Sequence, residues 1–224
     1  MVSRKRVDCE NRIIDDINNL TCPELKTSLG SMIHKGKGKP ATHHKSYRQV
    51  RVSPYLGRIL DEFMRPTTAS IARPLQDPNQ YGFTEDMTYL MGAVQRHECQ
   101  KHAIDTKQTC FGVSLDGDSA FEVVDRTIQT RELFFAGEEG DTWQYSYNSY
   151  QNTKCQVKLD GQLSQPFEED LGVRQGQVKS SDHYKVFVNT ALVDLDNTNL
   201  GYRIGPIVIN ATGVADDIYL TSDN

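Results

Sequence analysis

Residues 210–223 read NATGVADDIYLTSD, with Asp216 and Asp217 between two short apolar runs. Aspartate is a favoured turn residue, so this pattern by itself predicts a tight turn that joins two short strands. The same pair of carboxylates is also a candidate holder of metal ions. Residues elsewhere in the chain have to decide between these two interpretations.

A third carboxylate lies a hundred residues earlier, in the stretch CFGVSLDGD. Cys110–Leu115 is typical of a buried strand, and Asp116 comes directly after it. If this strand neighbours the C-terminal hairpin, Asp116 converges with Asp216 and Asp217. Carboxylates that lie close together repel one another unless a cation neutralises them, and Mg²⁺ suits this role because it prefers oxygen ligands. The three aspartates are therefore a candidate magnesium site, although each motif alone is better explained as a strand end or a turn.

The composition is that of a globular protein. Of the 224 residues, 37% are hydrophobic and 25% are charged, and no run of 18 apolar residues predicts a membrane span. The cysteines are odd in number and widely spaced: Cys9, Cys22, Cys99, Cys110 and Cys155. This pattern favours reduced thiols in an intracellular protein, nuclear or cytoplasmic.

The charge is distributed unevenly, although the formal net charge is only −5. Residues 1–65 contain 13 Lys/Arg and 7 Asp/Glu, whereas residues 66–224 contain 12 and 23. A polyanion needs a local positive surface and not a basic average, so the N-terminal part is compatible with nucleic-acid binding. The asymmetry alone is equally compatible with no such role.

The stretch from residue 32 to residue 52 predicts a hairpin. Met32–His34 and Tyr47–Val52 have strand-like composition and flank a loop rich in glycine and lysine. After it, Ser53-Pro54 resembles the start of a helix. The expected apolar face of this helix consists of Leu56, Ile59, Leu60 and Phe63.

Two further helices are predicted in the middle of the chain. One covers residues 85–102, and the residues expected to form its apolar stripe are Leu90, Met91 and Val94. The other begins near Asp118 or Ser119, and the residues expected on one of its sides are Phe121, Val124 and Ile128.

The last third of the chain begins with KCQVKLDGQL, in which Asp160-Gly161 suits a two-residue hairpin turn. A glycine-flanked loop and a helix over residues 180–195 follow, and then the closing strands. Helices and strands alternate irregularly, which favours an α+β fold with an antiparallel sheet and helices on one of its faces.

The order of these motifs resembles a reverse transcriptase of the non-LTR (LINE-type) retrotransposon class. The stretches that carry the resemblance are LKTSLGSMIHKGKGK, SYRQVRVSPYLGRILDEF, QYGFTED, LDGDSAFEVVDR, LGVRQG and VADD. They follow the family's order over about residues 24–222. The resemblance implies a right-hand polymerase fold with fingers and a partial palm. It also implies RNA-directed DNA synthesis by a nucleotidyltransferase that uses deoxynucleoside triphosphates, an RNA template and a DNA primer.

The resemblance also implies the roles of the acidic residues. Asp116, Asp216 and Asp217 would hold two Mg²⁺ ions, with Mn²⁺ as an alternative, for two-metal phosphoryl transfer. Phe121 would lie under the nucleotide sugar and exclude a 2′-hydroxyl. Without the resemblance, Phe121 is better interpreted as a core residue.

Further site residues follow from the same resemblance. Arg48 would grip the triphosphate, with Lys35 or Lys39 adding charge. Gln175 and Gly176 would pack on the incoming nucleotide and the template. The residue assigned to template phosphate is Arg174.

Several features depart from the family pattern. Val214 replaces the usual aromatic residue, Glu122 replaces an aspartate, and Lys179 and Ser180 replace Leu-Ser. The chain ends seven residues after Asp217, so we expect the thumb to be missing and the chain to be a truncated fragment.

The predicted organisation is a basic extension over residues 1–23 followed by fingers and palm over residues 24–224. The predicted fingers cover about 24–108 and parts of 140–175, and the predicted palm covers about 109–139 and 176–224. The alternative function is that of an inactive relic, at most a nucleic-acid-binding α+β domain.

Overall fold

The computed structural model describes residues 23–36, 38–159 and 161–223. The predicted basic extension therefore lies outside the described residues, apart from Pro23. In the described part of the chain, no helix combines the length and apolar character needed to cross a membrane.

The chain divides into two compact units. The first consists of Met1–Ile71 and Glu122–Ser180, and the second of Ala72–Phe121 and Ser181–Asn224. Both units contain helices and strands, in agreement with the predicted α+β class. The two units do not follow the expected bounds of fingers and palm, and that assignment stays a prediction.

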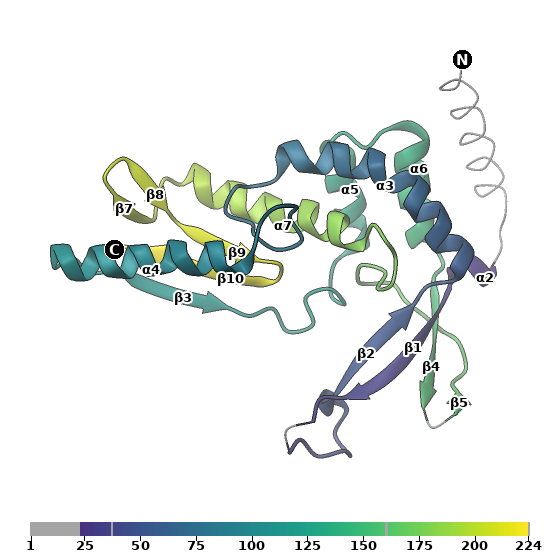
Figure 1. Ribbon diagram of the computed structural model, residues 1–224. Coiled ribbons are helices and arrows are strands. Elements are labelled where there is room, and N and C mark those ends of the chain that lie inside the picture. The colour runs from purple at the N-terminus through teal and green to yellow at the C-terminus, as the bar shows by residue number, and fades with distance from the viewer. Residues whose placement is uncertain (1–22, 37, 160, 224) are drawn as a thin grey trace. The chain divides into compact units, whose positions relative to one another are not determined.

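The first unit contains a five-stranded mixed sheet in the order β2-β1-β4-β5, with β6 also paired to β4 (Figure 1). Its strands are β1 (Thr27–His34), β2 (Tyr47–Val52), β4 (Lys154–Leu159), β5 (Gln162–Leu163) and β6 (Phe167–Glu168). β1 pairs antiparallel with β2 and parallel with β4. The predicted β1–β2 hairpin is confirmed, and so is the β4–β5 hairpin, where Leu159 pairs with Gln162.

The helices of this unit are α2 (Pro23–Lys26), η1 (His44–Ser46), α3 (Tyr55–Leu75), α5 (Arg126–Phe135) and α6 (Gly140–Tyr150), of which α3 continues into the second unit. The prediction that a helix begins near Asp118 was wrong, because α5 starts only at Arg126. The Asp125 side chain caps α5 by accepting hydrogen bonds from the backbone N–H groups of Thr127 and Ile128. Ser119 has φ 58°, in the left-handed region, which interrupts a helix.

The predicted apolar face of α3 is only partly right, since Leu56 and Phe63 are exposed whereas Leu60 packs against the buried Met64 and Tyr145. The buried face in the first unit also carries Asp61 and Thr68. Tyr145 donates a hydrogen bond to Asp61 Oδ1 at 3.0 Å, and Thr68 donates to Glu138 Oε1 at 2.8 Å. Paired polar groups thus join the apolar ones in this packing, and a hydrophobicity pattern does not detect them.

The second unit contains a three-stranded antiparallel sheet in the order β3-β10-β9 and a separate β7-β8 hairpin (Figure 1). Its strands are β3 (Phe111–Leu115), β7 (Tyr202–Ile204), β8 (Ile207–Ile209), β9 (Ala211–Val214) and β10 (Asp217–Ser222). The antiparallel sheet and the C-terminal hairpin are therefore present as predicted. The expectation that β3 is buried was wrong. Phe111, Val113 and Leu115 are 53%, 53% and 46% exposed, and β3 lies at the edge of the sheet.

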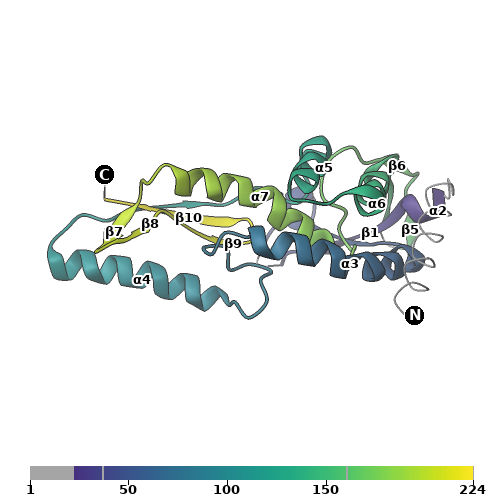
Figure 2. The same ribbon diagram turned by 90° about the horizontal axis from the view of Figure 1, so that it is seen from above.

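Two helices accompany this sheet, α4 (Tyr89–Thr106) and α7 (Ser180–Asn197). Figure 2 shows α4 and α7 running beside the strands of this unit. The expectation that the helices cover one face of the sheet stays a prediction. The predicted stripe of α4 was wrong as well, since Leu90, Met91 and Val94 are exposed.

The buried face of α4 consists instead of small residues, Gly92, Cys99 and Ala103. A Cβ built on Gly92 would lie 2.7 Å from Thr212 Cγ2, so the glycine allows α4 to approach β9 closely.

Candidate active site

The C-terminal hairpin presents Asp216 and Asp217 at its turn. Val214 pairs with Asp217, which leaves Ala215 and Asp216 as the two turn residues. Ala215 has φ 60°, an unfavourable value for a residue with a Cβ, so the surrounding structure must hold it. Asp216 is half-buried and Asp217 is exposed.

Asp116 lies at the same end of the sheet. Leu115, the last residue of β3, pairs with Ile218 of β10, so the register places Asp116 next to Asp217. A Cβ built on Gly117 would lie only 3.9 Å from the Asp216 Cβ. The neighbouring strands therefore bring the three predicted aspartates to the same end of the sheet. Asp116, however, follows an exposed strand and not a buried one.

The carboxylates suit a hard cation in their chemistry, because oxygen ligands are those that Mg²⁺ prefers. Among the described residues, however, no three His, Cys, Asp or Glu side chains form a ready group of metal ligands. The backbone thus places the donors together, and their side chains have still to turn toward a common ion. The assignment of these aspartates as metal ligands stays a prediction.

Phe121 lies in the turn after Asp116, inside an aromatic stack. Its ring is stacked on Tyr184 of α7, with centroids 4.0 Å apart and an interplanar angle of 21°. Phe83 meets Phe121 edge to face at 5.9 Å and 90°. Offset-stacked and edge-to-face rings attract one another, so Phe121 is held from two directions.

Tyr184 is 4% exposed, and the sequence analysis did not single it out. Burial, and secondarily the charge of Asp216, raises the pKa of Tyr184 to about 12. Its hydroxyl therefore stays protonated at neutral pH. A tyrosine inside a helix carries no signal of this role in the sequence, because the partner ring comes from a distant turn.

The remaining predicted site residues belong to the first unit. Lys35, Lys39 and Arg48 are exposed on the β1–β2 hairpin or its loop. Arg48 pairs with Ile33 across the hairpin, and the backbone N–H of Lys35 donates to Ser46 O at 2.7 Å. The hairpin thus presents three cationic side chains to solvent.

Gln175 and Gly176 form a loop that packs against the end of β2. Gln175 Nε2 donates to Glu122 Oε1 at 2.6 Å. Gly176 has φ +85°, and a Cβ there would lie 2.6 Å from the carbonyl oxygen of Arg51. This close approach explains the glycine through the protein's own backbone.

The placement of Arg174 argues against its predicted contact with template phosphate. Arg174 is only 5% exposed, and it donates to the carbonyl oxygens of Ser149 at 3.0 Å and Leu25 at 3.2 Å. Burial lowers the pKa of the guanidinium. Arg174 therefore acts inside the first unit, where it joins α6 to the residues before β1.

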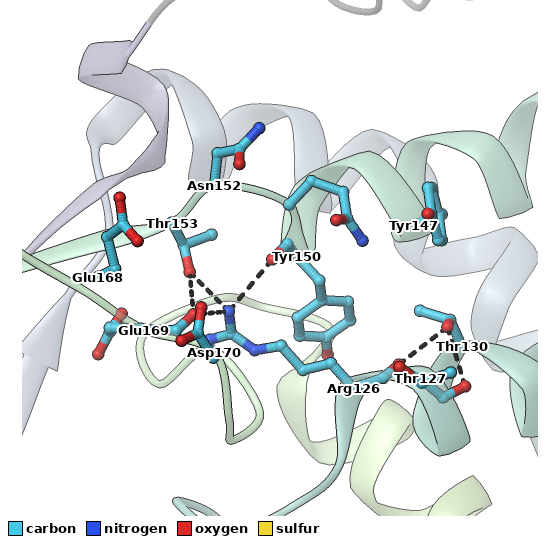
Figure 3. A pocket seen from close by; sticks show the side chains of 11 residues that line it. Arg126, Thr127, Thr130, Tyr147, Tyr150, Asn152, Thr153, Glu168, Glu169 and Asp170 are labelled. Atoms are coloured by element: carbon cyan, nitrogen blue, oxygen red, sulfur yellow. Dashed lines mark hydrogen bonds between the residues drawn. The ribbon is translucent and has the colours of Figure 1, made fainter.

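Arg126, the first residue of α5, has a similar structural role (Figure 3). It is 7% exposed and donates to the carbonyl oxygens of Tyr150 at 3.1 Å, Gly172 at 2.9 Å and Glu169, and to the Thr153 hydroxyl at 2.6 Å. Arg126, Tyr150, Thr153 and Glu169 are among the residues that line a cavity of about 290 Å³. The arginine thus ties α6, the residue before β4 and the loop before Gln175 to α5.

The comparisons with known proteins can be set against this geometry. Residues 33–224 match the family of reverse transcriptases (RNA-dependent DNA polymerases). The chain belongs to this family. Curated protein sequences give no match.

Among solved structures, this reverse transcriptase domain is similar to telomerases of the yeast Candida tropicalis. The apo enzyme truncated from its C-terminal domain matches with a TM-score of 0.61 and 10% identity, over 92% of this chain and 45% of the other. The apo telomerase gives 0.61 and 10%, over 91% and 40%. The complex with a TWJ fragment of telomeric RNA gives 0.60 and 10%, over 89% and 36%. At this identity the likeness shows the fold alone, and the chain spans less than half of each of these proteins.

The arginine network predicts the result of a substitution. Arg126→Met leaves several buried carbonyl oxygens without a donor, which should lower the free energy of unfolding by about 2–4 kcal/mol. Arg131→Met on the same helix removes an exposed pair with Glu132 and should change stability by less than about 0.5 kcal/mol. Urea unfolding of the two variants measures the difference, and equal losses would contradict the assigned role.

Proposed function

We propose that the chain carries out RNA-directed DNA synthesis, in which deoxynucleotides are added to a primer 3′ end, as the reverse transcriptase domain of a non-LTR retrotransposon. The observation that carries the proposal is the placement of Asp116 beside the Asp216–Asp217 pair at one end of the β3-β10-β9 sheet. Membership of the family supplies the class of reaction. The LINE-type origin rests on the sequence motifs.

Asp116 and Asp216, with Asp217 beside them, are the residues that would hold the divalent cations. Bound Mg²⁺ ions supply positive charge to the substrate phosphates and favour the ionised primer hydroxyl. The protein's own contribution is to keep the carboxylates at one strand end, where like charges favour capture of a cation.

Phe121 discriminates between sugars in this proposal. A ring held by Tyr184 on one side and Phe83 on the other cannot swing aside when a nucleotide binds. A ribonucleotide that brings a 2′-hydroxyl against the ring is therefore disfavoured. A steric clash rejects a substrate only if the clashing side chain cannot move away, and the aromatic stack holds the Phe121 ring in place.

The first unit contributes phosphate-binding and nucleotide-packing residues. Arg48, with Lys35 or Lys39, binds the triphosphate through its planar guanidinium. Gln175 and Gly176 pack on the nucleotide and template, with Gln175 oriented by its hydrogen bond to Glu122. The family resemblance assigns these residues to the same substrate.

The RNA template and DNA primer are the proposed nucleic-acid partners. The family is defined by copying RNA into DNA, and one structure of similar fold is a telomerase in complex with a fragment of telomeric RNA. A general copying enzyme binds the hybrid through backbone shape and charge, so affinity should fall with rising salt.

Loss of one carboxylate tests the proposed catalysis. Asp216→Asn should reduce primer extension on an RNA template with Mg²⁺ by at least about 100-fold, because a charge that holds the cations is removed. Asp223→Asn, an exposed aspartate just after β10, is the matched control and should leave extension unchanged. Equal rates for wild type and Asp216→Asn would contradict the proposal. No extension by the wild type would favour the inactive, nucleic-acid-binding alternative.

The role of Phe121 predicts a change in sugar selectivity. Phe121→Val should raise incorporation of ribonucleotides relative to deoxynucleotides by at least about tenfold, which corresponds to a clash of about 1.4 kcal/mol that is relieved. Phe111→Val, at the other end of β3, should leave the ratio unchanged. Single-nucleotide incorporation kinetics with matched ribo- and deoxynucleoside triphosphates measure it. A ratio that does not move in Phe121→Val would exclude this residue as the discriminating group.

A further inference from the structure

A short loop, Asn79–Phe83, lies between α3 and α4 and contacts the turn that carries Asp216. Gln80 is only 2% exposed, and its side-chain amide forms hydrogen bonds through both Oε1 and Nε2. Its Oε1 accepts hydrogen bonds from the backbone N–H groups of Ala215 at 3.0 Å and Gly82 at 2.9 Å. Its Nε2 donates to the carbonyl oxygen of Ala215 at 3.2 Å. One side chain thus satisfies both backbone groups of the residue before Asp216.

The backbone of the same loop adds further bonds to β9. Tyr81 N–H donates to Gly213 O at 2.8 Å, and Gly213 N–H donates to Asn79 O at 2.8 Å. A Cβ built on Gly82 would lie 2.1 Å from the Ala215 nitrogen. Only glycine fits at this position, so the backbone of the loop packs directly against the backbone of the hairpin turn.

These bonds concern a turn that does not hold its shape unaided. Ala215 has φ 60°, a conformation that an alanine avoids in the absence of other constraints. The hydrogen bonds of Gln80 to both the N–H and the C=O of Ala215 fix that conformation from outside. Because Asp216 is the next residue, its direction depends on the conformation that Gln80 imposes.

The last residue of the loop contacts the other part of the candidate site. Phe83 packs edge to face against Phe121, and the carbonyl oxygen of Phe83 accepts a hydrogen bond from Lys185 Nζ at 3.0 Å. Lys185 also forms an ion pair with Asp182 at 3.1 Å, so a paired lysine of α7 anchors this end of the loop.

We propose that Asn79–Phe83 is a positioning loop for the active site. Gln80 sets the conformation of the turn that directs Asp216, and Phe83 fixes the ring of Phe121. The loop itself contributes no metal ligand and touches no reacting atom. This inference rests on the proposed function for what the positioned groups do, whereas the control of Ala215 by Gln80 is independent of it.

The first test needs no catalysis. Gln80→Met keeps the length of the side chain and removes its hydrogen bonds, so the Ala215 amide should exchange with deuterium at least about tenfold faster. Binding of Mn²⁺ alone, followed by electron paramagnetic resonance, should weaken at least about threefold. Gln80→Glu keeps an oxygen acceptor for the two amides but loses the donor to the carbonyl oxygen of Ala215, so it should restore only part of the protection of Ala215. Gln100→Met, at an exposed position of α4, is the matched control for both readouts.

The second test separates the two ends of the loop by their effect on primer extension. Gln80→Met should raise the Mg²⁺ concentration for half-maximal rate and leave the ribo-to-deoxynucleotide ratio unchanged. Phe83→Leu should raise that ratio and leave the Mg²⁺ dependence unchanged. A loop that only stabilised the fold would lower both rates in proportion to the loss of folded protein and move neither selective readout.

The outcomes distinguish this inference from the proposed function. Unchanged exchange at Ala215 and unchanged Mn²⁺ affinity in folded Gln80→Met would overturn the positioning role of Gln80, whether or not the wild type extends primers. An inactive wild type in which Gln80→Met still shows faster exchange and weaker Mn²⁺ binding would overturn the proposed function and support the role of Gln80. If Gln80→Met does not fold, the wild type decides, because an Ala215 amide that exchanges as fast as exposed amides would overturn the assignment.

Discussion

The antiparallel register of β3 and β10 is the constraint on which the candidate site depends. By pairing Leu115 with Ile218, it brings Asp116 beside a turn that already carries two aspartates. Three carboxylates at one strand end favour the capture of a cation. The site also depends on elements that fix the turn before Asp216 and the ring of Phe121, and in the second unit these are the Asn79–Phe83 loop and the helix residues Tyr184 and Lys185.

The first unit is organised by a different kind of constraint. Two buried arginines, Arg126 and Arg174, donate to carbonyl oxygens of segments that are far apart in sequence. Hydrogen bonds offset the cost of burying a guanidinium, and these contacts fix the segment that precedes Gln175 and Gly176. The loop thus gains a defined position without regular secondary structure of its own. Polar networks in the first unit and aromatic and amide contacts in the second unit both hold predicted site residues in place.

The features that the sequence predicted correctly have local signals. The β1–β2 and β4–β5 hairpins follow from strand-like runs around turns that contain glycine. The helix predicted over residues 180–195 corresponds to α7. The C-terminal hairpin and the placement of Asp116 at a strand end were predicted in the same way.

Most of the wrong predictions concern contacts with no local signal. The buried side of α3 includes Asp61 and Thr68, which are polar and become suitable for burial only through Tyr145 and Glu138. No local signal marks the exposure of the β3 side chains. The start of α5 is an exception, because its Asp125 cap is a local signal that was missed. Arg174 was predicted to bind phosphate because the residues next to it in the sequence do not reveal which carbonyl oxygens surround its side chain. The role of Gln80 was missed for the same reason, since its partner Ala215 lies 135 residues away.

A crystal structure of the chain grown with Mn²⁺, which anomalous scattering identifies, tests the central claim most directly. The account predicts a Mn²⁺ ion coordinated by carboxylate oxygens of both Asp116 and Asp216, with Ala215 still held by Gln80. Mn²⁺ bound elsewhere, with no ion shared by Asp116 and Asp216, would contradict it.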